Sequence, residues 1–155
     1  MIAIASDRLG YPLKRVLAEH LTSRGLEYQD FGSWDSTTPV NYPIYGFRAA
    51  RAVQSGACSQ AILVCGTGLG MQLVANKVHG IRAVSANNEF LARMSREHND
   101  ANVLTLGAYI VGEELAKAIV DAWLDTQYDP WHQVRVDMLT EVEQTGELLA
   151  SQQVP

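Results

Sequence analysis

A run of glycines follows a cysteine near the middle of the chain, and this segment is the one best suited to chemistry. Cys65-Gly-Thr-Gly-Leu-Gly places Gly66, Gly68 and Gly70 at alternating positions directly after an apolar run. Such a loop turns sharply and points several N–H groups inward, and the positive end of a following helix adds to them, so the loop can hold developing negative charge. The same field favours the thiolate form of Cys65, which can take a proton from carbon.

Simpler interpretations of this loop stay open at the level of sequence. The glycines could serve only to let a helix pack tightly against a strand. A nucleotide site fits less well, because the spacing is GxGxG rather than GxGxxG, the loop follows the third predicted strand, and no P-loop motif occurs. The other cysteine, Cys58, is expected to be a small apolar residue beside a turn.

The elements that position Cys65 are predicted from apolar runs that alternate with amphipathic stretches, as in repeated strand-helix units of a parallel sheet. Strands are expected at residues 2–6, 26–31, 60–64, 81–85 and 102–106, and helices at residues 12–23, 45–54, 71–77, 88–97 and 112–125. A last helix is expected beyond Pro130, ending near residue 147, and it could pack on its own domain or on a partner subunit. The tail at about residues 148–155 is expected to fray.

Composition limits the number of domains and the class of protein. The 155 residues, 47% of them hydrophobic, suffice for one substantial core, so residues 1–155 are expected to form a single domain. A net charge of -5 without a basic run argues against nucleic acid as a partner. The first apolar stretch is interrupted by Asp7 and Arg8, so neither a signal peptide nor a membrane span is expected, and the protein is predicted to be cytoplasmic. Two cysteines and four scattered histidines predict neither a disulfide framework nor a metal site.

In an open parallel sheet the ligand crevice lies at the carboxyl ends of the strands, near the point where the strand order reverses. Besides Cys65, this rule selects Asp7 and Arg8 after the first strand, and we expect His98 and Asn99 at the end of the fourth unit to join them. Asp7 could instead cap the following helix. His98 alone could be a surface or core histidine, but its polar neighbours, where a helix gives way to a strand, favour a functional role.

Several separate motifs are together highly specific. They are Ser6-Asp-Arg-Leu-Gly, Asn41-Tyr-Pro, Cys65-Gly-Thr-Gly-Leu-Gly-Met, Ala75-Asn-Lys, Gly80-Ile-Arg-Ala and Ser95-Arg-Glu-His-Asn-Asp-Ala-Asn-Val. In them, and over residues 2–142, the chain resembles type B ribose-5-phosphate isomerases and the subunits of galactose-6-phosphate isomerase. The resemblance implies a Rossmann-like αβα sandwich with a five-stranded parallel sheet, a homodimer or dimer of dimers with a shared active site, and no metal or organic cofactor.

The resemblance also implies an activity and a role for each matching residue. The chain would be an aldose-ketose isomerase, with ribose 5-phosphate and ribulose 5-phosphate as the default substrate pair. Cys65 matches the base that moves a proton between adjacent sugar carbons through a cis-enediolate, and His98 matches the residue that helps to open the sugar ring, with Thr67 as an assistant. The other matches are Gly66, Gly68 and Gly70, whose loop amides stabilise the enediolate, and Asp7, Tyr42 and Asn99, which hold sugar hydroxyls.

The phosphate end of the site departs from the family pattern. Arg8 stands where histidine is usual, Tyr109 and Trp131 stand where arginines are usual, and only Arg135 keeps an expected guanidinium. Arg8 could compensate in part, because guanidinium binds phosphate through two hydrogen bonds. Trp131 could stack on a sugar face or pack against the terminal helix. Asn41, where aspartate is more usual, is a further change. A tetrose phosphate, a hexose phosphate or an unphosphorylated sugar is therefore an alternative substrate.

Two further hypotheses come from other classes of protein. The first is a non-catalytic sugar-phosphate-binding protein, against which the intact Cys65, Thr67 and His98 argue. The second is a thiol redox protein. It ranks last because no second cysteine lies at CxxC spacing and Cys58 is seven residues away.

Overall fold

The computed structural model describes residues 1–148, and its centre is one sheet of five parallel strands. The sheet has the order β2-β1-β3-β5-β4. The strands are β1 (Ile2–Ser6), β2 (Tyr28–Asp30), β3 (Gln60–Cys65), β4 (Ala83–Ser85) and β5 (Val103–Gly107). The chain passes from β1 outward to β2 and then returns to β3 on the other side of β1. The strand order therefore reverses between β1 and β3, which is where ligands bind in such sheets.

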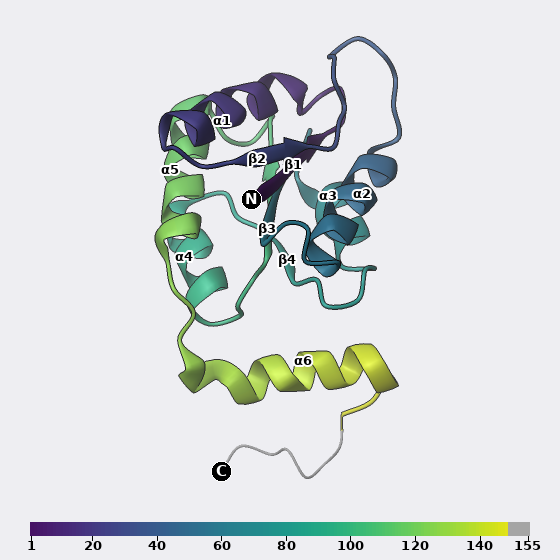
Figure 1. Cartoon of the computed structure of the whole chain (residues 1–155), viewed down its shortest axis with the longest axis vertical. Coiled ribbons are helices and arrows are strands. Elements are labelled where there is room, and N and C mark those ends of the chain that lie inside the picture. The colour runs from purple at the N-terminus through teal and green to yellow at the C-terminus, as the bar shows by residue number, and fades with distance from the viewer. Residues whose placement is uncertain (149–155) are drawn as a thin grey trace.

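Helices cover both faces of this sheet, which confirms the αβα sandwich. The helices are α1 (Tyr11–Ser23), α2 (Tyr42–Gln54), α3 (Leu69–Ala75), α4 (Glu89–Glu97), α5 (Glu113–Asp125), a short 3-10 helix η1 (Pro130–His132) and α6 (Gln133–Thr145). Figure 1 shows α1, α4 and α5 on one side of the sheet and α2 and α3 on the other. No helix within residues 1–148 is long and apolar enough to cross a membrane.

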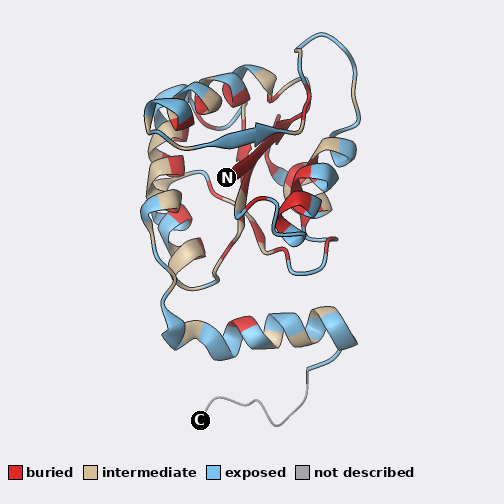
Figure 2. Ribbon diagram, viewed as in Figure 1, coloured by how far each residue is buried: buried red, intermediate tan, exposed pale blue. Residues whose placement is uncertain are grey.

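Two hydrophobic cores hold the layers together, one on each face of the sheet (Figure 2). Alternate residues of β3 enter different cores, since Ile62 and Val64 pack with α1 and α5 while Leu63 and Cys65 pack with α2 and α3. Burying each large apolar side chain stabilises the fold by about 1.5 to 3 kcal/mol. Cys65 is therefore the last residue of a well-packed strand, and the core fixes its position.

Most expected elements form, and their ends differ for local reasons. The helix expected at residues 45–54 begins at Tyr42, because Pro43 fits the first turn of a helix. The strand expected at residues 81–85 begins only at Ala83, whose backbone N–H and C=O both bond to the side chain of Asn76. The strand expected at residues 26–31 is limited to Tyr28–Asp30, and η1 was not expected.

The last helix, α6, lies apart from the sandwich (Figures 1 and 2). Val136 is its one buried residue within residues 1–148, whereas Val134, Leu139 and Val142 are exposed. A carboxylate oxygen of Glu143 accepts a 2.8 Å hydrogen bond from the N–H of Gly80 and ties α6 to the loop before β4. Packing of α6 on a partner subunit stays a prediction. All but the first residue of the expected frayed tail lies outside the described residues.

A buried lysine, which the sequence analysis did not single out, anchors the loop after β2. Lys14 lies on the apolar stripe of α1, and its side chain is 1% exposed. Its ammonium group donates to both carboxylate oxygens of Asp30 at 2.7 Å and to the carbonyl of Ser33 at 2.5 Å. Burial lowers the pKa of Lys14, while the hydrogen bond and charge of Asp30 act in the opposite direction. The charge is thus tolerated because all three ammonium protons have acceptors.

Replacing Lys14 with methionine is expected to destabilise the fold by about 2 to 3 kcal/mol, because it leaves the partly buried Asp30 carboxylate without its cation. Chemical denaturation measures the change in the free energy of unfolding. The control is Lys117→Met, which removes a surface ion pair with the exposed Glu114 and is expected to change the free energy of unfolding far less. Equal losses in the two variants would contradict a structural role for the buried pair.

Candidate active site

The Cys65 thiol lies at the carboxyl end of β3 and faces the glycine loop. It is 5% exposed, and its Sγ accepts a 3.2 Å hydrogen bond from the backbone N–H of Gly68. Gly68 has a φ of 82°, and a β-carbon there would lie 2.9 Å from Oγ of Ser85. Only glycine fits this conformation in this space. The loop therefore turns so that an amide points at the sulfur, as expected for a loop that holds negative charge.

The loop after β1 lies directly beside Cys65. The N–H of Asp7 donates to the carbonyl of Val64 at 3.2 Å, and Oδ1 of Asp7 accepts from the N–H of Gly10 at 2.8 Å. Asp7 thus closes the turn that precedes α1. It does not cap the helix, because the N-cap residue is Gly10 and α1 has no side-chain cap hydrogen bond within residues 1–148. The neighbouring Arg8 is exposed and forms no ion pair within residues 1–148. A guanidinium free of a carboxylate partner is able to bind an anion.

Two tyrosines and a threonine complete the surroundings of the glycine loop. A β-carbon on Gly70 would lie 2.8 Å from the ring of Tyr42, so the absence of a side chain at Gly70 makes room for that ring. The N–H of Tyr109 donates to the carbonyl of Gly66 at 2.9 Å, and the Tyr109 side chain is exposed. Thr67 is exposed, and its hydroxyl accepts from the N–H of Leu69 at 3.4 Å. Residues predicted from three distant segments therefore meet at this edge.

The second cysteine has a different environment, as expected. Cys58 is 1% exposed and packs among the apolar side chains of the α2 and α3 layer. Burial raises the pKa of the Cys58 thiol. Both thiols are free, and β3 lies between them, with Cys58 before its amino end and Cys65 at its carboxyl end. The length of a strand therefore separates them, which argues against a redox pair.

His98 does not join Cys65 within one chain. It follows α4 and precedes β5, and β5 runs parallel to β3 with Ala61 opposite Val103 and Cys65 opposite Gly107. His98 therefore lies beyond the amino edge of the sheet, and Cys65 lies at the carboxyl edge. Four residue steps of strand separate these edges by about 13 Å. The expectation that His98 and Asn99 lie at the carboxyl ends of the strands is wrong, because a helix between parallel strands returns the chain to their amino ends.

The residues predicted near the end of the chain gather around His98. The ring centroids of His98 and His132 are 4.1 Å apart, with 31° between the ring planes. The edge of Trp131 contacts His132 with centroids 4.8 Å apart, and the guanidinium carbon of Arg135 lies 4.8 Å from the Trp131 ring centre. Trp131 is 69% exposed, so it does not pack into the core of its own chain. Sequence reasoning missed His132, although the Asp129-Pro130 pair marks a turn that would present it.

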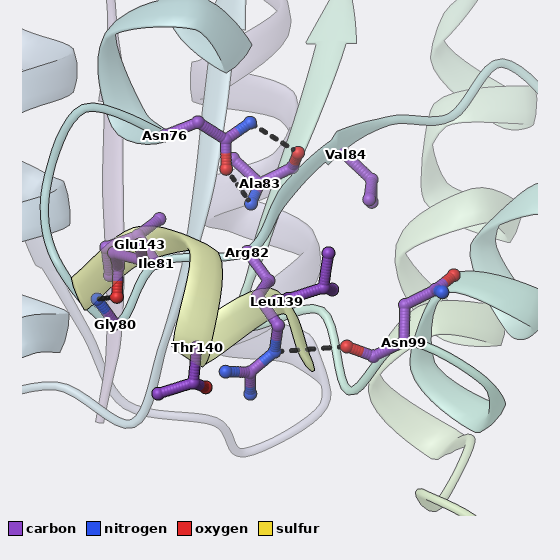
Figure 3. Close-up of a pocket in the computed structure, with 10 residues that line it drawn as sticks. All are labelled: Asn76, Gly80, Ile81, Arg82, Ala83, Val84, Asn99, Leu139, Thr140 and Glu143. Carbon is purple, nitrogen blue, oxygen red and sulfur yellow. Dashed lines mark hydrogen bonds between the residues drawn. The ribbon is translucent and has the colours of Figure 1, made fainter. Parts of the chain in front are cut away.

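A pocket of about 310 Å³ lies beside this second group, between α6 and the edge strand β4 (Figure 3). Asn99 is on its wall, together with apolar side chains such as Val84 and Leu139. Its wall also includes Arg82, whose Nε donates to the carbonyl of Asn99 at 3.0 Å. The pocket lies at the amino edge of the sheet, so Cys65 and the glycine loop do not line it. Within residues 1–148 no three His, Cys, Asp or Glu side chains gather into a possible metal site.

The fold and the thiol loop define a class: a parallel α/β protein with a cysteine held against backbone amides where the strand order reverses. A match to the Ribose/Galactose Isomerase family covers residues 2–139, and the chain belongs to this family. It is 47% identical to ribose-5-phosphate isomerase B of Escherichia coli strain K12 over 144 residues, covering 92% of this chain and 96% of the relative. It is also 42% identical to a D-erythrulose-4-phosphate isomerase of Pectobacterium atrosepticum over 130 residues, covering 83% and 84%.

A solved structure agrees with this assignment. The ribose-5-phosphate isomerase B of Clostridium thermocellum superposes with a TM-score of 0.91 at 48% identity, covering 94% of this chain and 99% of that one. The relatives act on sugar phosphates of different length, as their names state. The chain is therefore a sugar-phosphate isomerase, and the non-catalytic alternative loses its support.

Proposed function

We propose that the chain interconverts ribose 5-phosphate and ribulose 5-phosphate by proton transfer, in an active site completed by a second copy of the chain. The observation that carries the proposal is the Cys65 thiol, held by the Gly68 amide at the reversal point of the sheet. The chain also retains high identity to ribose-5-phosphate isomerases over nearly its whole length.

The chemistry follows from the groups at the carboxyl edge. The Cys65 thiolate takes the proton from C2 of the open-chain aldose, and the electron pair of that C–H bond moves into the new C1–C2 double bond of a cis-enediolate. Loop amides such as that of Gly68 stabilise the oxygen charge that develops. The proton then returns from sulfur to C1 as the double-bond electron pair forms the new C1–H bond. The hydroxyl proton on the C2 oxygen passes to the C1 oxygen, so that the C2 oxygen becomes the ketose carbonyl and the C1 oxygen a hydroxyl. Asp7 and Tyr42 would hold sugar hydroxyls beside the thiol.

The histidine to which the family resemblance assigns ring opening does not lie at this edge within residues 1–148. His98 and Asn99 lie at the opposite edge, so we propose that the equivalent residues of a second copy complete each site, which would make the protein a homodimer or a dimer of dimers. Two-fold dimers are the commonest closed assemblies. In such a dimer each chain would supply His98 to the site of the other. Thr67 would assist ring opening. We also infer a cytoplasmic enzyme, because the relatives are metabolic sugar-phosphate isomerases.

A tetrose phosphate is the second candidate substrate, because the phosphate end of the site departs from the family pattern and one relative is named for a tetrose phosphate. Tyr109 and Trp131 stand where the family resemblance expects arginines, so the site has fewer cations for the phosphate of a pentose. A relative 42% identical to this chain is a D-erythrulose-4-phosphate isomerase. The deciding experiment measures kcat/KM for pentose, tetrose and hexose phosphates and for the matching free sugars. Highest kcat/KM with ribose 5-phosphate supports the proposal, and a preference for a tetrose phosphate or a free sugar contradicts it.

Replacing Arg8 with alanine is expected to raise the KM for the preferred sugar phosphate by about tenfold or more, because a lost charged hydrogen bond costs roughly 1.5 to 3 kcal/mol. Steady-state kinetics on the panel provide the measurement. Arg15→Ala is the control, since Arg15 is exposed on α1 and its one ion pair within residues 1–148 is with Glu19 on the same helix. If Arg8→Ala behaves like Arg15→Ala, then Arg8 does not bind the phosphate.

A further inference from the structure

The close stack of two imidazoles at the amino edge points to a role for His132 that the proposed mechanism does not assign. Its ring lies against that of His98 with centroids 4.1 Å apart and planes 31° from parallel. The His98 side chain is 41% exposed at the C-terminal end of α4. One face of the proposed ring-opening group is thus covered by a neighbour from the end of the chain, and the rest stays open to a second copy.

The turn that carries His132 is fixed to the helix that carries His98. The N–H of Asp129 donates to the carbonyl of Glu97 at 3.0 Å, directly before His98. The backbone carbonyl of Asp129 accepts from the N–H of His132 at 3.0 Å. The side-chain Oδ1 of Asp129 accepts from the N–H of Trp131 at 3.0 Å. Three hydrogen bonds on one aspartate therefore set the position of His132 relative to the end of α4.

The other side of His132 is supported as well. The rings of Trp131 and His132 pack edge to face with centroids 4.8 Å apart. The guanidinium carbon of Arg135 lies 4.8 Å from the ring centre of Trp131. By contrast, the carboxylate of Glu97 lies 3.8 Å from Nε2 of His98, which is too far for a hydrogen bond. The imidazole of His98 is therefore oriented mainly by the ring packed against it.

We infer that His132 is a positioning residue, which holds the imidazole of His98 in the orientation that opens the sugar ring. This inference rests on the proposed function. His132 acts through the stack and does not touch the sugar, so an aromatic ring of similar size is expected to replace it. An aromatic pair contributes about 0.5 to 1.5 kcal/mol, which corresponds to a loss of roughly two- to thirteenfold when the stack is removed.

The two sugars of the proposed reaction separate ring opening from proton transfer. Ribose 5-phosphate closes to a five-membered ring through its C4 oxygen, so its isomerisation requires ring opening. Ribulose 5-phosphate cannot close such a ring, because the C5 oxygen that would attack C2 carries the phosphate. Exchange of hydrogen at C1 of ribulose 5-phosphate with D₂O therefore reports the proton transfer alone.

The experiment compares His132→Ala, His132→Phe and His79→Ala with the wild type in the full-length protein. His79 is an exposed histidine in the turn before β4, outside both groups of site residues, and serves as the control. We expect His132→Ala to lower kcat/KM for ribose 5-phosphate by roughly three- to tenfold while deuterium exchange into ribulose 5-phosphate stays within about twofold. His132→Phe is expected to restore most of the loss, and His79→Ala to change neither rate.

The outcomes separate the inference from the function on which it rests. Equal losses of isomerisation and exchange in His132→Ala would overturn the inference, because a general disturbance of the fold affects both. So would an unchanged rate with ribose 5-phosphate, or a His132→Phe variant as slow as His132→Ala. A wild-type protein that neither isomerises ribose 5-phosphate nor exchanges ribulose 5-phosphate would instead overturn the proposed function.

Discussion

Replacing Cys65 with alanine is expected to lower kcat by about two to four orders of magnitude, the range that a positioned general base contributes. The substitution removes the only thiol of residues 1–148 that lies next to the glycine loop. The loop itself should keep its shape, because Gly68 turns through its own φ of 82° rather than through the sulfur contact. Steady-state kinetics with the preferred sugar phosphate give the measurement.

The matched control for this prediction is Cys58→Ala. Both cysteines are buried and lie at the two ends of one strand, so both substitutions remove a small apolar volume from the same layer. Thermal unfolding should show that each variant stays folded. Only the Cys65 variant should lose turnover. Comparable losses of kcat in both variants would mean that packing, and not proton transfer, explains the effect.

Mixing two inactive variants is expected to restore activity, and this is the second large effect. In a dimer with shared sites, a Cys65→Ala chain paired with a His98→Asn chain forms one site with both defects and one site with none. If the chains pair at random, half of the dimers are mixed, so about one quarter of all sites regain wild-type composition. Each variant alone supplies no such site. Co-expression with two affinity tags and assay of the purified mixture give the measurement.

The control pairs two defects on the same edge of the sheet. Cys65→Ala mixed with Asp7→Asn leaves no site fully intact, provided that Cys65 and Asp7 act within one chain, as their adjacent loops indicate. That mixture should show no more activity than the separate variants. If Cys65→Ala and His98→Asn also fail to complement after subunits have mixed, the site is not shared between copies.

The thiol side of the site could be predicted from sequence because each of its parts is local. A cysteine that ends an apolar run and begins a glycine loop must lie at the end of a strand, whatever else the chain does. The carboxyl ends of parallel strands meet at one edge, so Asp7, which directly follows β1, and Tyr109, two residues after β5, belong beside Cys65. The order of strands and helices along the chain is therefore enough to predict that these residues lie close together.

The histidine side could not be placed in the same way, because its position depends on the direction in which the chain crosses the sheet. Polar residues at the end of a helix resemble those at the end of a strand in composition, but they lie at the other edge. The stack of His98 on His132 joins segments 34 positions apart through an irregular turn, which has no hydrophobic period. The burial of Lys14 could not be predicted either. Its position follows the apolar period of α1, but a buried charge needs a partner, and that partner comes from a distant loop.

The central claim is that one sulfur carries hydrogen between neighbouring carbons of the sugar. The most direct measurement follows deuterium entering C1 of ribulose 5-phosphate in D₂O, by NMR, with the wild type, Cys65→Ala and Cys58→Ala. We predict incorporation with the wild type and Cys58→Ala and none above background with Cys65→Ala. Incorporation at the wild-type rate in Cys65→Ala would contradict the claim.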